Sequence, residues 1–275
     1  MNYITNQIEN ALDVQTGIGG IIGTREYQQD FAYIYTDKRD VLGILCDGMG
    51  GLNGGEAASQ TAVSVMAGAF LKERPQHDIP GFFFDTAKKM DKMVAGLTDK
   101  NGKALNAGTT ALAALIRDGE LYIMSVGDSK LYLIREDKIK TLTREHNYRL
   151  QLTEQRDAGM ISAKKFEEES NTRMAEALIS YVGMNGLART DINRQPFLLQ
   201  DGDIVLLCSD GLYKAMSEQK IYAMIRDNDF DMELAAARLL DMSKRCAERT
   251  QDNTTVILMK YEKEMKGGCS HGQML

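Results

Sequence analysis

Six short apolar segments, each bounded by Gly, Asp or Asn, most constrain what this chain can fold into. They cover residues 41–46, 110–116, 120–126, 130–134, 204–209 and 254–259. Apolar runs of this length that end in turn-forming residues are typical of buried strands. Only Arg117-Asp118-Gly119 joins the second run to the third, and only Gly127-Asp128-Ser129 joins the third to the fourth. Connections this short favour antiparallel hairpins, so the sequence predicts antiparallel sheet.

Segments with helical periodicity alternate in blocks with the predicted strands. Helices are expected at 56–70, 82–97, 218–227 and 232–248. In the second of these, Phe83, Ala87, Met90 and Val94 recur at intervals of three or four residues, which places them on one buried face. Ser217 precedes the third helix and is a suitable N-cap. The predicted class is therefore α+β, with helices covering antiparallel strands.

Composition narrows the functional classes. The 275 residues carry a net charge of −6, which disfavours a general nucleic-acid surface. Three histidines are too few for a His-rich zinc site, and the four cysteines contain no CxxC pair. Cys46 and Cys208 lie within apolar runs and are expected to be buried thiols. The sequence has neither a signal peptide nor an apolar stretch of membrane-spanning length, so a cytoplasmic protein without membrane contact is expected.

Residues 1–262 are predicted to form a single domain. Within it, residues 144–190 are polar and charged, and we expect them to form a flap-like insertion between strands. Residues 263–275 are expected to be a disordered tail.

Five aspartates stand at the ends of predicted strands or in the turns between them. They are Asp30, Asp47, Asp128, Asp210 and Asp252. A single Asp-Gly pair usually marks a plain turn, so the hypothesis depends on the whole set. Carboxylates that meet at one edge of a sheet repel one another unless cations neutralise them. Ligation by oxygen alone selects Mg²⁺, Mn²⁺ or Ca²⁺ over zinc.

The segment 47–56 is rich in glycine and lies between a predicted strand and a predicted helix. A dinucleotide-binding loop would need glycine at position 53, which is Asn53, and the chain contains no GxxxxGK[ST] phosphate loop. The glycines better suit a backbone that bends sharply and offers a carbonyl oxygen to a metal.

Several motifs in order resemble the metal-dependent Ser/Thr protein phosphatases, the PPM or type 2C family, in their compact bacterial form. They are Gly23-Thr24-Arg25 with Asp30, Cys46-Asp47-Gly48-Met49-Gly50-Gly51, Ala107-Gly108-Thr109-Thr110, Ser125-Val126-Gly127-Asp128-Ser129, Leu142-Thr143-Arg144-Glu145-His146, Cys208-Ser209-Asp210-Gly211 and Gln251-Asp252-Asn253-Thr254. The match spans roughly residues 20–260. It implies a four-layer α-β-β-α sandwich with two central antiparallel sheets flanked by helices.

The resemblance also implies roles for individual residues. Asp47 corresponds to the carboxylate that bridges two metals, and Gly48 to the residue that offers a backbone carbonyl. Asp210 and Asp252 correspond to the other ligands of the pair. Asp30 matches an aspartate that holds a metal-bound water, and Asp128 matches the ligand of a third, weaker metal. Arg25 matches the phosphate-binding arginine, and Asn253 is expected to orient Asp252.

Two Mg²⁺ or Mn²⁺ ions in the core site, with a third in some relatives, are the implied cofactors. Paired ions lower the pKa of a bridging water, which attacks phosphorus without a covalent enzyme intermediate. Met49 stands where eukaryotic relatives carry a histidine proposed as general acid, and methionine has no proton to donate. Leaving-group protonation is therefore assigned to water.

The sequence thus predicts a phosphoserine and phosphothreonine phosphatase that acts as a monomer on phosphorylated proteins. The implied partners are a bacterial Ser/Thr kinase or its substrates, by analogy with the family. The alternative is a catalytically weak, phosphatase-like module that binds a regulatory partner. Such modules lose metal ligands, whereas this chain keeps all five aspartates and Arg25.

Overall fold

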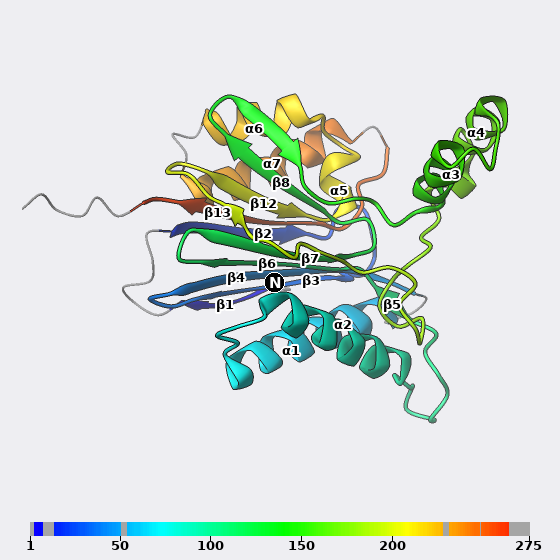
Figure 1. The fold of residues 1–275 in the computed structure, drawn as a ribbon, viewed down its shortest axis with the longest axis horizontal. Helices are drawn as coiled ribbons and strands as arrows, with labels where there is room; N and C mark the ends of the chain where they lie inside the picture. The colour runs from blue at the N-terminus through cyan, green and yellow to red at the C-terminus, as the bar shows by residue number, and fades with distance from the viewer. Residues whose placement is uncertain (1–2, 8–13, 51–53, 228–230, 248, 264–275) are drawn as a thin grey trace, which may run out of the picture.

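The computed structural model describes residues 3–7, 14–50, 54–227, 231–247 and 249–263. Two β-sheets lie face to face, with helices on the outer face of each (Figure 1). The predicted four-layer sandwich is confirmed.

The first sheet contains eight strands. Its order is β1 (Tyr3–Gln7), β3 (Asp30–Thr36), β4 (Asp40–Met49), β6 (Ala111–Arg117), β7 (Glu120–Val126) and β10 (Asp191–Ile192), with β11 (Phe197–Leu198) also on β7 and β5 (Gly108–Thr109) on β4. All these pairs are antiparallel except β1, which runs parallel to β3 at the sheet edge. β1 was not predicted from the sequence.

The second sheet contains five strands, all antiparallel. Its order is β2 (Val14–Ile21), β13 (Thr254–Tyr261), β12 (Ile204–Cys208), β8 (Lys130–Arg135) and β9 (Lys138–Thr141). Side chains such as Ile34, Leu45, Leu112, Leu207 and Ile257 fill the space between the two sheets and are fully buried. This shared core fixes the two sheets relative to each other.

Helices cover the outer faces of both sheets (Figure 1). α1 (Gly54–Glu73) and α2 (Ile79–Ala95) pack on the first sheet, and α5 (Asp210–Tyr213), α6 (Glu218–Arg226) and α7 (Met232–Cys246) pack on the second. The four predicted helices are therefore confirmed. The Ser217 side chain accepts from the backbone N–H of Lys220, as its predicted N-cap role requires.

One predicted hairpin is wrong. β7 and β8 do not pair, because the chain crosses from the first sheet to the second at Gly127-Asp128-Ser129. Gly127 has φ of 101°, and a Cβ there would lie 2.6 Å from the Thr110 side chain. A short connection can therefore change sheets as well as reverse direction. Here the crossing places Asp128 at the edge where both sheets end.

The segment expected to form a flap contains α3 (Tyr148–Asp157), α4 (Ala163–Ser170) and a 3₁₀ turn, η1 (Arg173–Glu176). α3 and α4 project away from the sandwich (Figure 1). At the base of this segment, Arg189 pairs with Glu154, and Arg144 pairs with Asp191 at 2.8 Å.

Cys46 and Cys208 are buried free thiols, as predicted. The expected tail lies, apart from Lys263, outside the described residues. Within those residues, no helix combines the length and the apolar character needed to cross a membrane.

Candidate metal centre

A cavity of about 320 Å³ lies at the edge where the two sheets end. Its lining includes most of the predicted site residues, namely Arg25, Asp47, Gly48, Asp128, Asp210, Asp252 and Asn253. Asp30 lies close by, with 1% of its surface exposed. Residues spread over more than two hundred positions of sequence are thus brought to one place.

Asp30 and Asp47 face each other across paired strands. Asp30 begins β3, and its register partner on β4 is Asp47. Asp30 Oδ2 accepts a hydrogen bond of 2.8 Å from Ser209 Oγ. Asp30 Oδ1 is buried and has no hydrogen-bond partner within the described residues. A buried carboxylate oxygen without a donor is the arrangement expected beside a bound cation or its water.

Two threonines fix the main chain of Asp47. Its N–H donates to Thr110 Oγ1 at 2.9 Å, and its carbonyl oxygen accepts from Thr109 Oγ1 at 2.9 Å. Thr110 Oγ1 also lies 2.8 Å from Ser129 Oγ, so it connects the Asp47 strand to the turn that carries Asp128. The sequence motif contained both threonines, but no role was predicted for either.

Gly48 sits where no larger residue fits. A Cβ there would lie 2.1 Å from the carbonyl oxygen of Gly55 and 2.5 Å from that of Gln29. The Gly48 N–H donates to the same Gln29 oxygen at 3.1 Å. This crowding explains why the end of β4 requires glycine, because the start of α1 packs directly against it.

Arg25 and Asp252 form an ion pair at the cavity mouth, with Arg25 Nη2 2.6 Å from Asp252 Oδ2. The Asn253 backbone N–H donates to the other oxygen, Asp252 Oδ1, at 2.8 Å. The Asn253 side chain instead binds the loop that carries Arg25. It donates to the carbonyl oxygens of Ile22 and Tyr27 and accepts from the Gln29 N–H.

Asp210 begins α5 and pairs with Lys214 one turn later on the same side of the cavity. The neighbouring Tyr213 hydroxyl donates to the Asp128 carbonyl oxygen at 3.2 Å. Lys214 was not among the site residues predicted from the sequence. Its position four residues after Asp210 was the signal that could have identified it.

His146 contacts the turn that carries Asp128. It is fully buried, and its Nδ1 accepts from the Gly127 N–H at 3.2 Å. Its Nε2 lies 3.2 Å from Asp191 Oδ2. The close approach of His146, together with the Arg144 guanidinium, lowers the pKa of Asp191 below its usual range. These contacts give His146 a structural role, because they hold the turn that leads to Asp128.

The crowded carboxyl groups have raised pKa values. Burial raises the pKa of Asp30 to about 7, the charges of Asp210 and Asp252 add to the rise, and the Ser209 hydrogen bond opposes it. Burial and the nearby Asp30 charge hold the pKa of Asp47 well above its ordinary value. Burial, with the Asp210 charge, raises the pKa of Asp128 to about 6. The positive groups and hydrogen-bond donors around the site therefore do not fully compensate its negative charge.

Within the described residues, no three His, Cys, Asp or Glu side chains are arranged as a ready-made metal site. Asp210 and Asp252 point instead to Lys214 and Arg25. The donors nevertheless fit hard divalent ions, because they are carboxylate and backbone oxygens, and one buried carboxylate oxygen lacks a partner. The two basic side chains partly balance the charge that such ions would neutralise.

The raised pKa values predict an unusual pH dependence for the metal-free protein. The folded-state pKa values of Asp30 and Asp128 lie above the ordinary value of 3.8, so the folded chain binds more protons than the unfolded chain between about pH 4 and 7. Stability should therefore fall as the pH rises through this range. In EDTA, we expect Tm to drop by roughly 5 °C between pH 5.5 and 8. A Tm in EDTA that stays level or rises would contradict this charge assignment.

Comparison with known families gives one match over most of the chain. Residues 22–255 match the family described as Protein phosphatase 2C. Among characterised proteins, the serine/threonine phosphatase stp of Listeria innocua is 27% identical over 247 residues, which cover 88% of this chain and 94% of that protein.

Solved structures share the fold. Serine/threonine phosphatase Stp1 from Staphylococcus aureus superimposes with a TM-score of 0.74 at 23% identity, covering 93% of this chain and 98% of that one. The catalytic domain of serine/threonine protein phosphatase PstP, in complex with two manganese ions, gives a TM-score of 0.71 at 23% identity and covers 91% of this chain and 99% of that one.

Proposed function

This chain belongs to the protein phosphatase 2C family and is a protein-serine/threonine phosphatase, and we propose that the aspartate cavity is its reaction centre. The observation that carries the proposal is the convergence of Asp47, Asp128, Asp210 and Asp252 on one cavity with Arg25 at its mouth. An arginine beside a cluster of carboxylates suits a site that binds cations and a phosphoryl group together.

We assign the metal-holding roles by position. Asp47, Asp210 and Asp252, with the Gly48 carbonyl oxygen, would hold two Mg²⁺ or Mn²⁺ ions. Asp30, with its unpartnered Oδ1, would hold a water of that site, and Asp128 would hold a third ion. When bound, paired divalent ions supply an activated water and neutralise charge on the phosphoryl oxygens.

The protein's own groups bind and orient the substrate. The Arg25 guanidinium offers two parallel N–H donors to two phosphoryl oxygens once the ions compete for Asp252. Asn253 keeps the Arg25 loop in place through Ile22 and Tyr27. Met49 lines the cavity but has no proton to donate, so the leaving oxygen takes its proton from solvent water.

The activity is tested by hydrolysis of a phosphothreonine peptide with Mn²⁺ and again with EDTA. We expect phosphate release with Mn²⁺ and none after chelation. Release that continues undiminished in EDTA would exclude the proposed centre.

Replacing Arg25 with Ala is expected to raise KM for a phosphopeptide by about tenfold, with a smaller effect on kcat, because a bidentate phosphate contact is lost. Arg25→Lys should recover only part of the loss, since lysine cannot form the fork. Steady-state kinetics measure both parameters. The exposed Arg245 on α7 offers a control, Arg245→Ala, that should leave KM unchanged. An unchanged KM in Arg25→Ala would remove the assigned role.

The physiological substrates are proposed to be proteins phosphorylated by a bacterial Ser/Thr kinase, or that kinase itself, with the phosphatase acting as a monomer. We further propose that residues 144–190 select among these substrates, because Leu178 from this segment lines the cavity and the α3 and α4 helices of the same segment project away from the sandwich (Figure 1). Exchanging the segment for that of another family member should change the order of preference among phosphopeptides. An unchanged order would exclude this role.

A further inference from the structure

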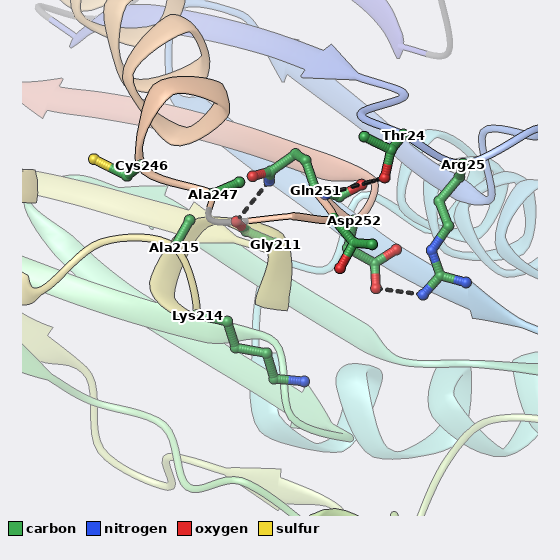
Figure 2. Close-up of a pocket in the computed structure, with 10 residues that line it drawn as sticks. Thr24, Arg25, Gly211, Lys214, Ala215, Cys246, Ala247, Gln251 and Asp252 are labelled. Carbon is green, nitrogen blue, oxygen red and sulfur yellow. Dashed lines mark hydrogen bonds and ion pairs between the residues drawn. The ribbon is translucent and has the colours of Figure 1, made fainter.

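A second, larger cavity of about 720 Å³ adjoins the candidate metal centre. The two cavities share Arg25 and Asp252, so they lie next to each other with that ion pair between them. Lys214, Thr24, Gly211 and Gln251 also line the second cavity (Figure 2). We call it the Lys214 cavity. Of the residues that line this cavity, only Asp252 was given a role in metal binding.

Hydrogen bonds hold the walls of the Lys214 cavity in place. Thr24 N–H and Oγ1 both donate to the Gln251 carbonyl oxygen, at 2.8 and 3.0 Å, and the Gln251 N–H donates back to Thr24 Oγ1. The Gln251 side chain donates to the Gly211 carbonyl oxygen at 3.0 Å (Figure 2). Three segments far apart in sequence are thus joined, and the cavity is preformed.

The charge of this cavity depends on what Asp210 and Asp252 bind. In the structure, Lys214 pairs with Asp210, and Arg25 pairs with Asp252. Lys214 and Arg25 retain 51% and 59% side-chain exposure, so both remain open to an incoming group. If Asp210 and Asp252 bind divalent ions, Lys214 and Arg25 lose these partners. Both cationic side chains then remain beside the proposed phosphate position. The lining then favours an anion.

We propose that the Lys214 cavity binds an acidic or phosphorylated side chain that lies next to the phosphorylated residue of the substrate. The inference rests on the proposed function, because it places the reacting phosphate at Arg25. A substrate chain anchored there extends into the adjoining cavity, and its neighbouring side chain meets the Lys214 ammonium. Carboxylate and phosphate share the required negative charge, and a peptide series separates them.

The test compares phosphothreonine peptides that differ only at the residues flanking phosphothreonine. Those residues are Gln, Glu, Lys or phosphoserine, placed on either side in turn. We expect the wild-type protein with Mn²⁺ to favour Glu or phosphoserine over Gln on one side by about fivefold in kcat/KM, the size of one partly exposed charge contact. A larger ratio for phosphoserine than for Glu would identify a second phosphate as the preferred ligand.

Lys214→Met should reduce this preference to about one, and Lys214→Glu should reverse it in favour of Lys. The matched control is Lys244→Met, which removes the same charge from an exposed position on α7 outside the cavity. That control should keep the wild-type preference. Fluorescence anisotropy of labelled, dephosphorylated peptides gives a readout independent of turnover, and the Glu peptide should bind more tightly than the Gln peptide only when Lys214 is present.

The ratio of kcat/KM between peptides distinguishes a role of Lys214 in specificity from a structural role. If Lys214 only positions Asp210, Lys214→Met will lower kcat for every peptide equally and leave the ratio unchanged, which overturns the proposal. A wild-type protein that hydrolyses all the peptides equally also overturns it while leaving the phosphatase function intact. A wild-type protein that hydrolyses none refutes the proposed function, and this inference falls with it.

Discussion

Asp47→Asn is expected to lower kcat for a phosphothreonine peptide by roughly a thousandfold, because the substitution removes a carboxylate that we propose would hold the ions. Asp210→Asn should have an effect of similar size. The metal-free protein should meanwhile become more stable, by about 1 kcal/mol for Asp47→Asn, because a neutral amide no longer repels Asp30 across the paired strands. Loss of activity together with a higher Tm in EDTA would separate a functional defect from misfolding.

The control for these variants is Asp85→Asn, at an exposed position on α2 remote from the cavity lining. It should change neither kcat nor Tm appreciably. If both Asp47→Asn and Asp210→Asn kept wild-type kcat, the cavity would not be the reaction centre.

Arg117→Leu is expected to have the largest effect on stability, about 3–5 kcal/mol, because it leaves the Asp40 carboxylate buried without its charge partner. Arg117 on β6 makes two hydrogen bonds to Asp40 on β4, at 2.5 and 2.7 Å, and a third to the Pro75 carbonyl oxygen. Both side chains are only 5% exposed. Urea unfolding at neutral pH measures the loss as a lower midpoint with an unchanged slope.

Arg39→Leu provides the comparison, since Arg39 makes an exposed ion pair with Asp118 at 3.3 Å. That pair should contribute less than about 1 kcal/mol. The double variant Asp40→Leu/Arg117→Leu should recover much of the stability lost in Arg117→Leu, because no unpaired charge remains buried. A single variant as stable as the wild type would show that the buried pair contributes nothing.

Local sequence patterns predicted the elements whose burial is strongly periodic or continuous. β4, β6, β12 and β13 are almost wholly buried, so their apolar runs identified them. β2 was not predicted, because its sequence, VQTGIGGI, is interrupted by glycines. Those glycines lie against neighbouring elements; a Cβ at Gly17, for instance, would meet the Met232 carbonyl oxygen on α7 at 1.9 Å. This reason for glycine lies in tertiary packing and has no local signal.

The crossing between the sheets at Gly127 could not be predicted from the local sequence either. A three-residue connection between two apolar runs fits a hairpin, and nothing in those residues distinguishes it from a passage between sheets. The distinction depends on pairing of β8 with β12, more than seventy residues later in the chain. Because of this pairing, Asp128 reaches the same edge as Asp210.

Residue type and order were enough to identify the aspartates as a set, since acidic residues at strand ends have few structural uses together. Their supporting contacts were not predictable in the same way. Ser209 binds Asp30 across 179 positions of sequence, and Thr110 connects Asp47 to Ser129. These are ordinary polar residues whose roles depend on the distances between strands of different sheets.

Equilibrium binding of Mn²⁺ to the metal-stripped protein, measured by calorimetry and by metal analysis after dialysis, tests the central claim most directly. We predict about two ions bound per wild-type chain, with a weaker third at higher concentration, and the loss of tight binding in Asp47→Asn. Wild-type protein that binds no Mn²⁺, or an Asp47→Asn variant that binds it with unchanged stoichiometry and affinity, would contradict the assignment of this cavity as a metal centre.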